Sequence, residues 1–197
     1  MSRTHGSWAA VVLTGGTASR LGGADKAALE HAGKSLLAHA LAAVAGAGEV
    51  VVVGPELPTS RPVRFTREEP SGGGPLAGVA AGVAALSSDP DRVVVLAVDM
   101  PHVTAGTVAR LLDAAEGVDG AWLTDRDGRR QLAGAVRPSL VPSPGDASGA
   151  PARLLMSAGT VRDVPAIEHE AEDVDTWEDV ARILGRDAHG VARPDQT

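Results

Sequence analysis

Strand-like apolar runs alternate with segments of helical period along most of this chain. We expect strands where β-branched side chains gather, at residues 8–14, 50–53, 63–66 and 92–98. Helices are expected where apolar side chains recur at helical spacing, at residues 35–47 and 76–86 and after a cap at Thr104. This alternation predicts an α/β fold, a three-layer α/β/α Rossmann-like domain with a mainly parallel sheet.

The pattern changes after residue 118. Apolar runs at 121–124 and 132–136 flank a polar turn, which predicts a hairpin or two strands around a loop. Residues 138–151 are rich in Pro, Ser and Gly and predict a mobile surface loop.

A capping box begins at Thr176 and ends at Asp179, so we expect a final helix that stops at Gly185. The acidic run around it, residues 163–179, is expected to be mostly a solvated face. We therefore expect one domain over residues 8–185, with an N-terminal tail at 1–7 and a flexible C-terminal tail at 186–197.

Composition excludes several classes of protein. The chain has no cysteine, which excludes disulfides, thiolate zinc sites and a cysteine nucleophile. Its net charge of −7 and its few aromatic residues disfavour a nucleic-acid partner. No apolar run approaches the ~20 residues that span a bilayer, and the first residues lack a signal-peptide pattern. We expect a cytoplasmic protein without membrane contact.

The first strand opens into a glycine-rich loop, Gly15-Gly16-Thr17-Ala18-Ser19-Arg20-Leu21-Gly22-Gly23-Ala24-Asp25-Lys26. Glycine lets backbone N–H groups approach anionic oxygens, and successive N–H groups form an anion-binding concavity. Arg20 can bind two phosphate oxygens at once, and Lys26 can supply a point charge. The loop therefore predicts a nucleotide site.

The spacing of this loop excludes two common phosphate motifs. No Ser or Thr follows Lys26 as a P-loop requires, and Gly15-Gly16-Thr17 lacks the spacing of the dinucleotide fingerprint. A glycine-rich connection with incidental charges is the alternative. The fixed spacing of Arg20, Gly22 and Lys26 resembles the signature loop of the nucleotidyltransferase superfamily.

The apolar run at 92–98 ends in Asp99-Met100-Pro101-His102. A carboxylate at the end of a buried strand can hold Mg²⁺, which takes one or two protein carboxylates together with phosphate oxygens and water. The alternative is that Asp99 caps the next turn. Because the glycine-rich loop ends a neighbouring strand, the two features predict one site. His102 is the histidine nearest to this predicted site. It could take part in the site, or it could be a residue of a surface turn.

Four motifs together resemble the molybdenum cofactor guanylyltransferases: the glycine-rich loop, Gly74-Pro75-Leu76-Ala77-Gly78, the strand ending at Asp99, and Asp173-Val174-Asp175-Thr176-Trp177-Glu178-Asp179. The resemblance covers about residues 8–185. It implies the nucleotide-diphospho-sugar transferase type of fold. It also implies Mg²⁺-dependent transfer of GMP from GTP to the phosphate of molybdopterin, with release of pyrophosphate.

The resemblance also implies roles for individual residues. Arg20, Lys26 and Asp99 would be catalytic, and Asp99 and Asp175 would bind the metal. The acceptor would lie near Gln131, Arg153 and Asp173, although Arg153 could equally be a helix-surface arginine. Glu69 could contact the base or the ribose, or be merely solvated. The implied nucleotide-binding residues are Leu13, Thr14, Gly15, Gly16, Arg20, Lys26, Glu69, Gly74, Pro75, Leu76 and Asp99.

Departures from the family pattern leave alternatives open. Thr14 replaces a common alanine, and Asp173 and Asp175 replace asparagines in a form that is typical of related cytidylyltransferases. A cytidylyltransferase, or another transferase acting on a phosphorylated small molecule, is therefore the first alternative. A non-catalytic nucleotide-binding protein is the second. Expected partners are GTP and molybdopterin, with transient contacts to proteins that make or accept the molybdenum cofactor.

Overall fold

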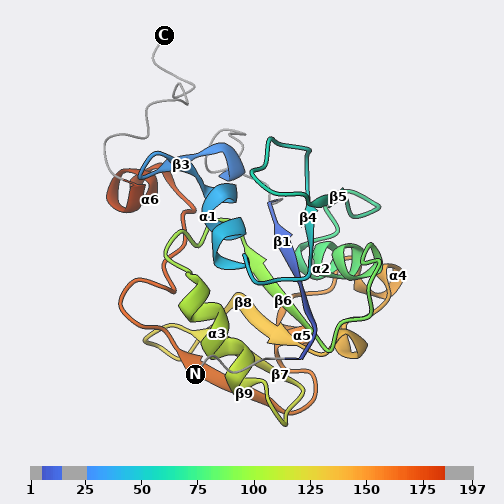
Figure 1. Cartoon of the computed structure of the whole chain (residues 1–197). Coiled ribbons are helices and arrows are strands. Elements are labelled where there is room, and N and C mark those ends of the chain that lie inside the picture. Colours follow the sequence, from blue (N-terminus) through green and yellow to red (C-terminus); the bar gives the residue numbers. More distant parts are fainter. Residues whose placement is uncertain (1–5, 15–25, 185–197) are drawn as a thin grey trace.

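A seven-stranded sheet forms the centre of the molecule (Figure 1), which a computed structural model describes over residues 6–14 and 26–184. Its strand order is β5-β4-β1-β6-β8-β7-β9, and all strands run parallel except β8. The strands are β1 (Trp8–Leu13), β4 (Glu49–Val53), β5 (Arg64–Thr66), β6 (Arg92–Ala97), β7 (Gly120–Thr124), β8 (Arg130–Val136) and β9 (Val161–Pro165). The predicted mainly parallel sheet is confirmed.

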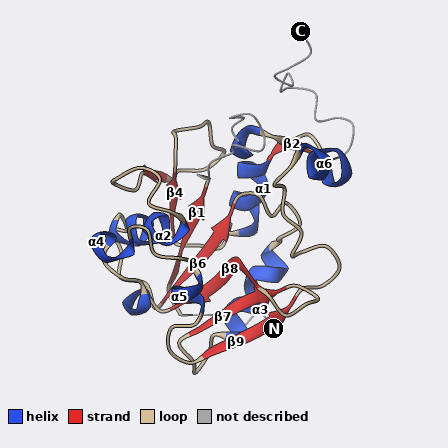
Figure 2. Cartoon of the chain, turned by 180° about the vertical axis from the view of Figure 1, so that it is seen from behind, coloured by secondary structure: helices blue, strands red, loops and turns tan. Residues whose placement is uncertain are grey.

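Helices cover both faces of the sheet, which gives the predicted three layers. Helices α1 (Leu36–Ala43) and α3 (Ala105–Ala114) lie in front of it in Figure 1. Figure 2 shows the other face, with α2 (Pro75–Ala84), α4 (Pro144–Ala147) and α5 (Arg153–Met156). Within the described ranges, none of the helices has the length and apolar character needed to cross a membrane.

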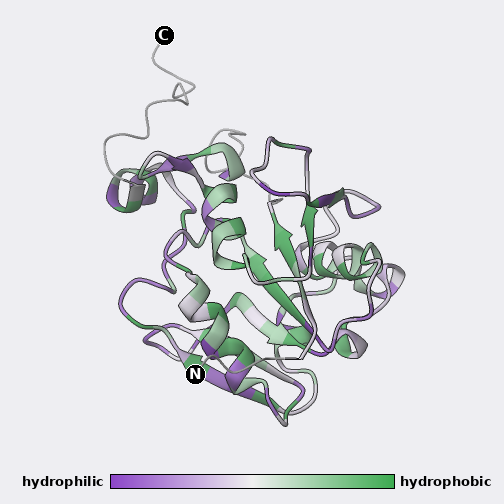
Figure 3. Ribbon diagram, viewed as in Figure 1, coloured by the Kyte–Doolittle hydropathy of each residue, from purple (hydrophilic) through white to green (hydrophobic). Residues whose placement is uncertain are grey.

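Alternation along the central strands builds one core on each face. Figure 3 shows hydrophobic colour concentrated on β1, β4 and β6. Side chains that point toward α1 and α3 include Ala10, Val12, Val94 and Leu96. Side chains that point toward α2 include Val11, Leu13, Val93 and Val95. The strand at 92–98 is thus buried on both faces, as its unbroken apolar run predicts.

Several short elements complete the fold. A 3-10 turn (Lys26–Ala28) precedes a small hairpin of β2 (Glu30–His31) and β3 (Lys34–Ser35). On the C-terminal side, α6 (Trp177–Asp179) continues as a π-helical turn (Val180–Leu184). The sequence pattern predicted neither the small hairpin nor β9, because each strand is too short or too polar to show alternation.

Two predicted features are confirmed in detail and one is wrong. The hairpin after residue 118 is the antiparallel pair β7–β8. Thr176 forms the predicted capping box, since its hydroxyl accepts from the Asp179 amide while an Asp179 oxygen accepts from the Thr176 amide. The loop predicted at 138–151 instead contains a 3-10 helix (Pro138–Leu140) and α4, because Ser143 caps α4 and Ala147 is buried. Gly185 and both predicted tails, except for residues 6 and 7, lie outside the described residues.

The topology indicates where a ligand binds. From β1 the chain adds β4 and β5 on one side and then returns to add β6 on the other. Ligands of such sheets bind at the carboxyl ends of the strands. In this sheet the carboxyl ends of the two central strands lie side by side, at Leu13, which ends β1, and at Asp99, which follows β6, and this strand-end region is called the crevice below.

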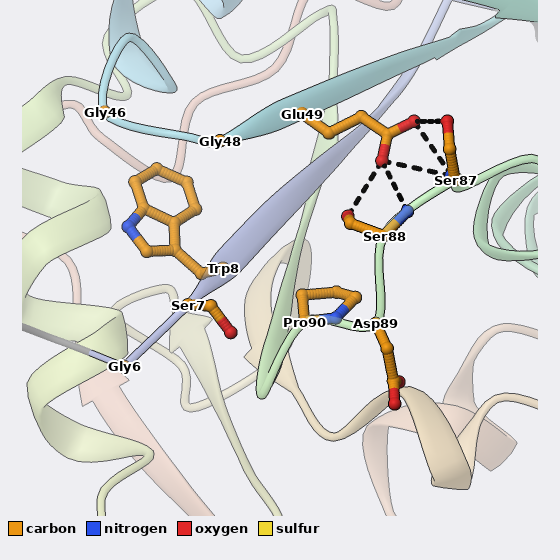
Figure 4. A pocket seen from close by; sticks show the side chains of 10 residues that line it. All are labelled: Gly6, Ser7, Trp8, Gly46, Gly48, Glu49, Ser87, Ser88, Asp89 and Pro90. Atoms are coloured by element: carbon orange, nitrogen blue, oxygen red, sulfur yellow. Dashed lines mark hydrogen bonds between the residues drawn. The ribbon is translucent and has the colours of Figure 1, made fainter.

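At the amino ends of the strands, away from the crevice, Glu49 is the first residue of β4. Its carboxylate accepts hydrogen bonds of 2.8 to 3.1 Å from the hydroxyls and amides of Ser87 and Ser88, inside a pocket beside Trp8 (Figure 4). These bonds, first of all from the Ser87 amide, lower the pKa of Glu49 from 4.5 to about 2. The carboxylate thus joins β4 to the loop that follows α2.

Glu49→Gln is expected to lower the free energy of unfolding at pH 7 by about 1–2 kcal/mol, because hydrogen bonds to a charged acceptor are lost. Since the pKa of Glu49 is lower in the folded protein, its contribution is present above pH 4.5 and declines as the pH falls toward about 2. Denaturant unfolding at pH 7 and pH 3 measures the difference. Glu56→Gln, at an exposed site, is the control. An effect of Glu49→Gln that is equal at both pH values would contradict this account.

Gly134 in β8 lies against the ring of Trp122, which is fully buried. A Cβ at Gly134 would come within 2.2 Å of Trp122 Cε3 and 2.7 Å of the Ala121 carbonyl oxygen. Gly134→Ala is therefore expected to destabilise the protein by about 3 kcal/mol, through overpacking. Thermal unfolding measures this. Gly145→Ala is the matched control, because its Cβ would meet nothing closer than 3.9 Å. Equal melting temperatures for the two variants would refute the packing argument.

Candidate active site

Three charged side chains meet at the crevice between β1 and β6. The ammonium of Lys26 lies 3.0 Å from Asp99 Oδ2 and 2.6 Å from Asp175 Oδ1. The Lys26 side chain is only 13% exposed, whereas that of Asp175 is 47% exposed. Two predicted metal ligands and one predicted phosphate ligand therefore form a single cluster that opens to solvent on the Asp175 side.

Local structure explains the place of Lys26. The 3-10 turn that begins at Lys26 is closed by the hydrogen bond from the Leu29 amide to the Lys26 carbonyl. Ala27 and Leu29 are buried in the core beneath α1. The Leu36 amide in turn donates to the Leu29 carbonyl. Burial of these apolar neighbours fixes the backbone, so the lysine side chain is directed to the crevice.

Asp99 is positioned by the end of β6, and it positions Asp175 in turn. The Val98 amide donates to the Leu13 carbonyl at 2.9 Å, which continues the pairing of the two central strands to the start of Asp99. The Val174 amide donates to the Asp99 carbonyl at 2.9 Å, and Val174 is fully buried. The segment with Asp175 is thus attached directly to the residue at the end of β6.

Glu170 holds the rest of that returning segment, and the sequence did not single it out. Its carboxylate accepts from the Thr107 hydroxyl, from both terminal nitrogens of Arg110 and from the Ile167 amide, at 2.5 to 2.9 Å. Burial opposes ionisation here, but the bonds from Arg110 and Thr107 outweigh it and lower the pKa of Glu170. A lone glutamate within an acidic run carries no signal that could have identified this contact.

Of the eight acidic residues in the run 163–179, four are exposed and four are half-buried, so the run is in part the solvated face that the sequence predicts. Besides Glu170 and Asp175, three acidic side chains of the run pair with basic residues. Asp163 pairs with Arg130, Glu172 with His169 and Arg182, and Asp179 with Arg182. Charge pairing therefore shapes the run as it passes from β9 to α6.

The charges of the cluster shift two pKa values. Burial alone would lower the pKa of Lys26, but hydrogen bonds to Asp175 and Asp99 outweigh burial and raise it. Partial burial, followed by repulsion from Asp175 and Asp99, raises the pKa of Asp173. At neutral pH the lysine is therefore a permanent cation among carboxylates.

The nucleotide-side residues lie at the same edge of the sheet. Leu13 ends β1, and the Thr14 amide and hydroxyl both donate to the Val53 carbonyl at 3.0 Å. Gly74 and Pro75 begin α2, where Gly74 has a φ of 89° that favours glycine. Leu76 is buried one position later. A Cβ at Gly78 would meet Leu13 Cδ2 at 3.3 Å, so the start of α2 packs directly against the end of β1.

The remaining predicted nucleotide residues fall into two groups. Gly15, Gly16 and Arg20 lie outside the described residues, so their places stay predictions. Glu69 is exposed in the loop before α2, whereas its neighbour Glu68 accepts from the Gly72 amide at 3.3 Å. The position of Glu69 thus fits either of its two predicted roles.

The three predicted acceptor residues come from different parts of the fold. The pairing of β6 with β8 places Gln131 near the crevice edge, where its amide nitrogen donates to Asp125. Arg153 is exposed at the start of α5, which packs on the face of α2. Asp173 precedes Val174, which is buried on the face of α1 and α3. The structure therefore brings Asp173 to the charged cluster but places Arg153 on an element of the opposite face.

His102 lies in the turn that follows β6, as the second of its two predicted roles requires. It is half-buried with its ring centroid 5.5 Å from that of His31 and 5.8 Å from that of His169. Burial, followed by the neighbouring His31, lowers the pKa of His102 below its ordinary value. A neutral imidazole at neutral pH follows from this, and its role in the site stays a prediction.

The donor set suits a divalent cation that also binds phosphate. The part of the chain that the structure describes holds no ready group of three or more His, Asp or Glu ligands. Mg²⁺ requires fewer, because it retains water and binds phosphate oxygens beside one or two carboxylates. The ammonium of Lys26 already shows that a cation is stable between Asp99 and Asp175. These two carboxylates therefore fit the expected metal.

Comparison with known proteins agrees with this arrangement. Residues 10–175 match the family model described as the MobA-like NTP transferase domain. A molybdenum cofactor guanylyltransferase of Acidiphilium cryptum is 39% identical over 111 residues, which cover 52% of this chain and 55% of that protein. The match thus spans about half the length of that relative.

A second relative is named for phosphoenolpyruvate instead of the molybdenum cofactor. A phosphoenolpyruvate guanylyltransferase of Streptomyces scabiei is 34% identical over 159 residues, which cover 76% of this chain and 73% of that protein. Among solved structures, molybdopterin-guanine dinucleotide biosynthesis protein A of Archaeoglobus fulgidus has the same fold, with a TM-score of 0.70 at 20% identity and coverage of 89% and 96% of the two chains. The chain belongs to the MobA-like NTP transferase family and is a nucleotidyltransferase.

Proposed function

We propose that this enzyme transfers GMP from GTP to a phosphate group of a small acceptor and releases pyrophosphate. The observation that carries the proposal is the cluster of Lys26, Asp99 and Asp175 at the crevice between β1 and β6. Molybdopterin is the proposed acceptor. The Acidiphilium relative, named for the molybdenum cofactor, and the matched family model support this choice.

In the proposed reaction, an oxygen of the acceptor phosphate forms a bond to the α-phosphorus of GTP. The bond from the α-phosphorus to the bridging oxygen breaks, and its electron pair leaves with pyrophosphate. A phosphate monoester is already ionised at pH 7, so the acceptor needs no general base. Catalysis therefore depends on positioning the two phosphates and on neutralising their charge.

Each charged residue has one proposed task. Lys26 binds oxygens of the β- and γ-phosphates, and Arg20 assists it. Asp99 and Asp175 hold Mg²⁺, which supplies Lewis-acid neutralisation of the phosphate oxygens when bound. Thr14 and the start of α2 support the nucleotide, since both border the crevice. Asp173 and Gln131 lie on the side proposed for the acceptor.

A second acceptor is supported by a specific observation. The relative named for phosphoenolpyruvate covers more of this chain than the Acidiphilium relative does, 76% against 52%. Phosphoenolpyruvate is also a phosphorylated small molecule, so the same displacement would apply to it. The choice between the two acceptors depends on the surroundings of Gln131, Arg153 and Asp173.

Nucleotide choice is tested by calorimetry with GTP, CTP, ATP and UTP, each with and without Mg²⁺. We expect GTP to bind at least tenfold more tightly than the other three when Mg²⁺ is present. A preference for CTP would instead establish the cytidylyltransferase alternative, which the aspartates at 173 and 175 favour. Binding of GTP without any turnover would leave a non-catalytic nucleotide-binding protein.

Turnover is tested by following pyrophosphate release from GTP with molybdopterin and, separately, with phosphoenolpyruvate. Asp99→Asn is expected to lower kcat/KM by about 100-fold or more, because it removes a charged metal ligand. Asp89 is an exposed carboxylate at the amino ends of the strands, away from the site, so Asp89→Asn should leave the rate unchanged. Full activity of Asp99→Asn would refute the metal assignment, and release with only one acceptor would identify the substrate.

A further inference from the structure

Lys26 occupies the position that the proposed metal needs. Its ammonium lies within 3.0 Å of both Asp99 and Asp175, the two carboxylates assigned to the cation. A divalent ion bound to the same oxygens would meet this positive charge at close range. The lysine and the metal therefore cannot both keep these contacts, because like charges at such a distance repel strongly when partly buried.

Without another anion to receive it, the lysine leaves this position only at a cost in free energy. Its side chain is 13% exposed, so withdrawal into the protein without a partner would leave a buried charge unpaired. A lysine stem is flexible and its ammonium acts as a point charge, which suits transfer from one set of oxygens to another. A nucleoside triphosphate brings such oxygens and at the same time completes the coordination of the metal.

We propose that Lys26 and the divalent cation compete for the Asp99–Asp175 pair, so that the metal binds tightly only when a polyphosphate takes over the lysine. The inference rests on the proposed function for the identity of that polyphosphate. It predicts weak metal binding by the free protein and strong coupling between metal and nucleotide. Such coupling is reciprocal, so each ligand raises the affinity for the other by the same factor.

The lysine content of the chain offers a direct test. Only two lysines are present, Lys26 in the cluster and Lys34, which is exposed on β3. Lys26→Met removes the ammonium and keeps a long apolar stem, whereas Lys34→Met removes an unrelated ammonium nearby. Calorimetry with Mn²⁺ alone, and with Mn²⁺ plus a non-hydrolysable GTP analogue, compares both variants with the unaltered protein.

Lys26→Met is expected to bind Mn²⁺ alone at least tenfold more tightly than the unaltered protein, and Lys34→Met to bind it equally. Asp99→Asn added to Lys26→Met should abolish the gain, which assigns the binding to this site. In the unaltered protein the GTP analogue should tighten Mn²⁺ binding at least tenfold, and in Lys26→Met it should do so much less. Equal Mn²⁺ affinity of Lys26→Met and the unaltered protein would overturn the proposal.

A second measurement needs no variant. An amine-acylating reagent at fixed pH labels Lys26 and Lys34, and mass spectrometry of the peptides reports each rate. Mn²⁺ at saturation should speed the labelling of Lys26 at least threefold relative to Lys34, and addition of the GTP analogue should slow it again. An unchanged ratio at saturating Mn²⁺ would refute the competition. The measurements with Mn²⁺ alone contain no nucleotide, so they test the competition even if GTP is the wrong substrate. Failure of the proposed function would appear only in the measurements with nucleotide and in the turnover assay.

Discussion

The contact of one ammonium with two carboxylates joins three distant parts of this chain. Lys26 precedes Asp99 by 73 positions and Asp175 by 149, yet both carboxylates lie within 3.0 Å of its nitrogen. Carboxylates gathered this closely repel one another, and this repulsion adds to burial in raising the pKa of Asp173. The lysine offsets that repulsion, so the crevice can hold several negative charges before any ligand binds. The segment after β9 therefore returns to the sheet edge instead of being repelled from it.

The backbone makes this contact possible through very few hydrogen bonds. The Val98 amide binds the Leu13 carbonyl, and the Val174 amide binds the Asp99 carbonyl. Each bond connects a loop of the site to the end of a buried strand. Glu170 adds a second attachment on α3, through Thr107 and Arg110. Charged side chains on turns and irregular segments are thus anchored to rigid elements through their backbone neighbours.

Apolar patterning predicted the central sheet well, because β1, β4 and β6 have unbroken apolar runs that only a sheet covered on both faces can bury. The place of Asp99 followed from the end of such a run. The contact between Asp99 and Lys26 could not be predicted, because the pairing of two side chains 73 positions apart leaves no local signal in the sequence. Glu170 and Glu49 escaped prediction for the same reason. Their partners lie on other elements, and nothing in the neighbouring residues marks an acceptor of several hydrogen bonds.

The place of Asp175 after every strand of the sheet has a consequence for how the molecule assembles. During synthesis, β1 and β6 are complete long before Asp175 emerges, because the sheet ends with β9 at Pro165. Until then Lys26 has only one of its two carboxylate partners, and the segment that carries Val174 cannot cover the core. The charged cluster therefore cannot be completed until the chain beyond the last strand has been made.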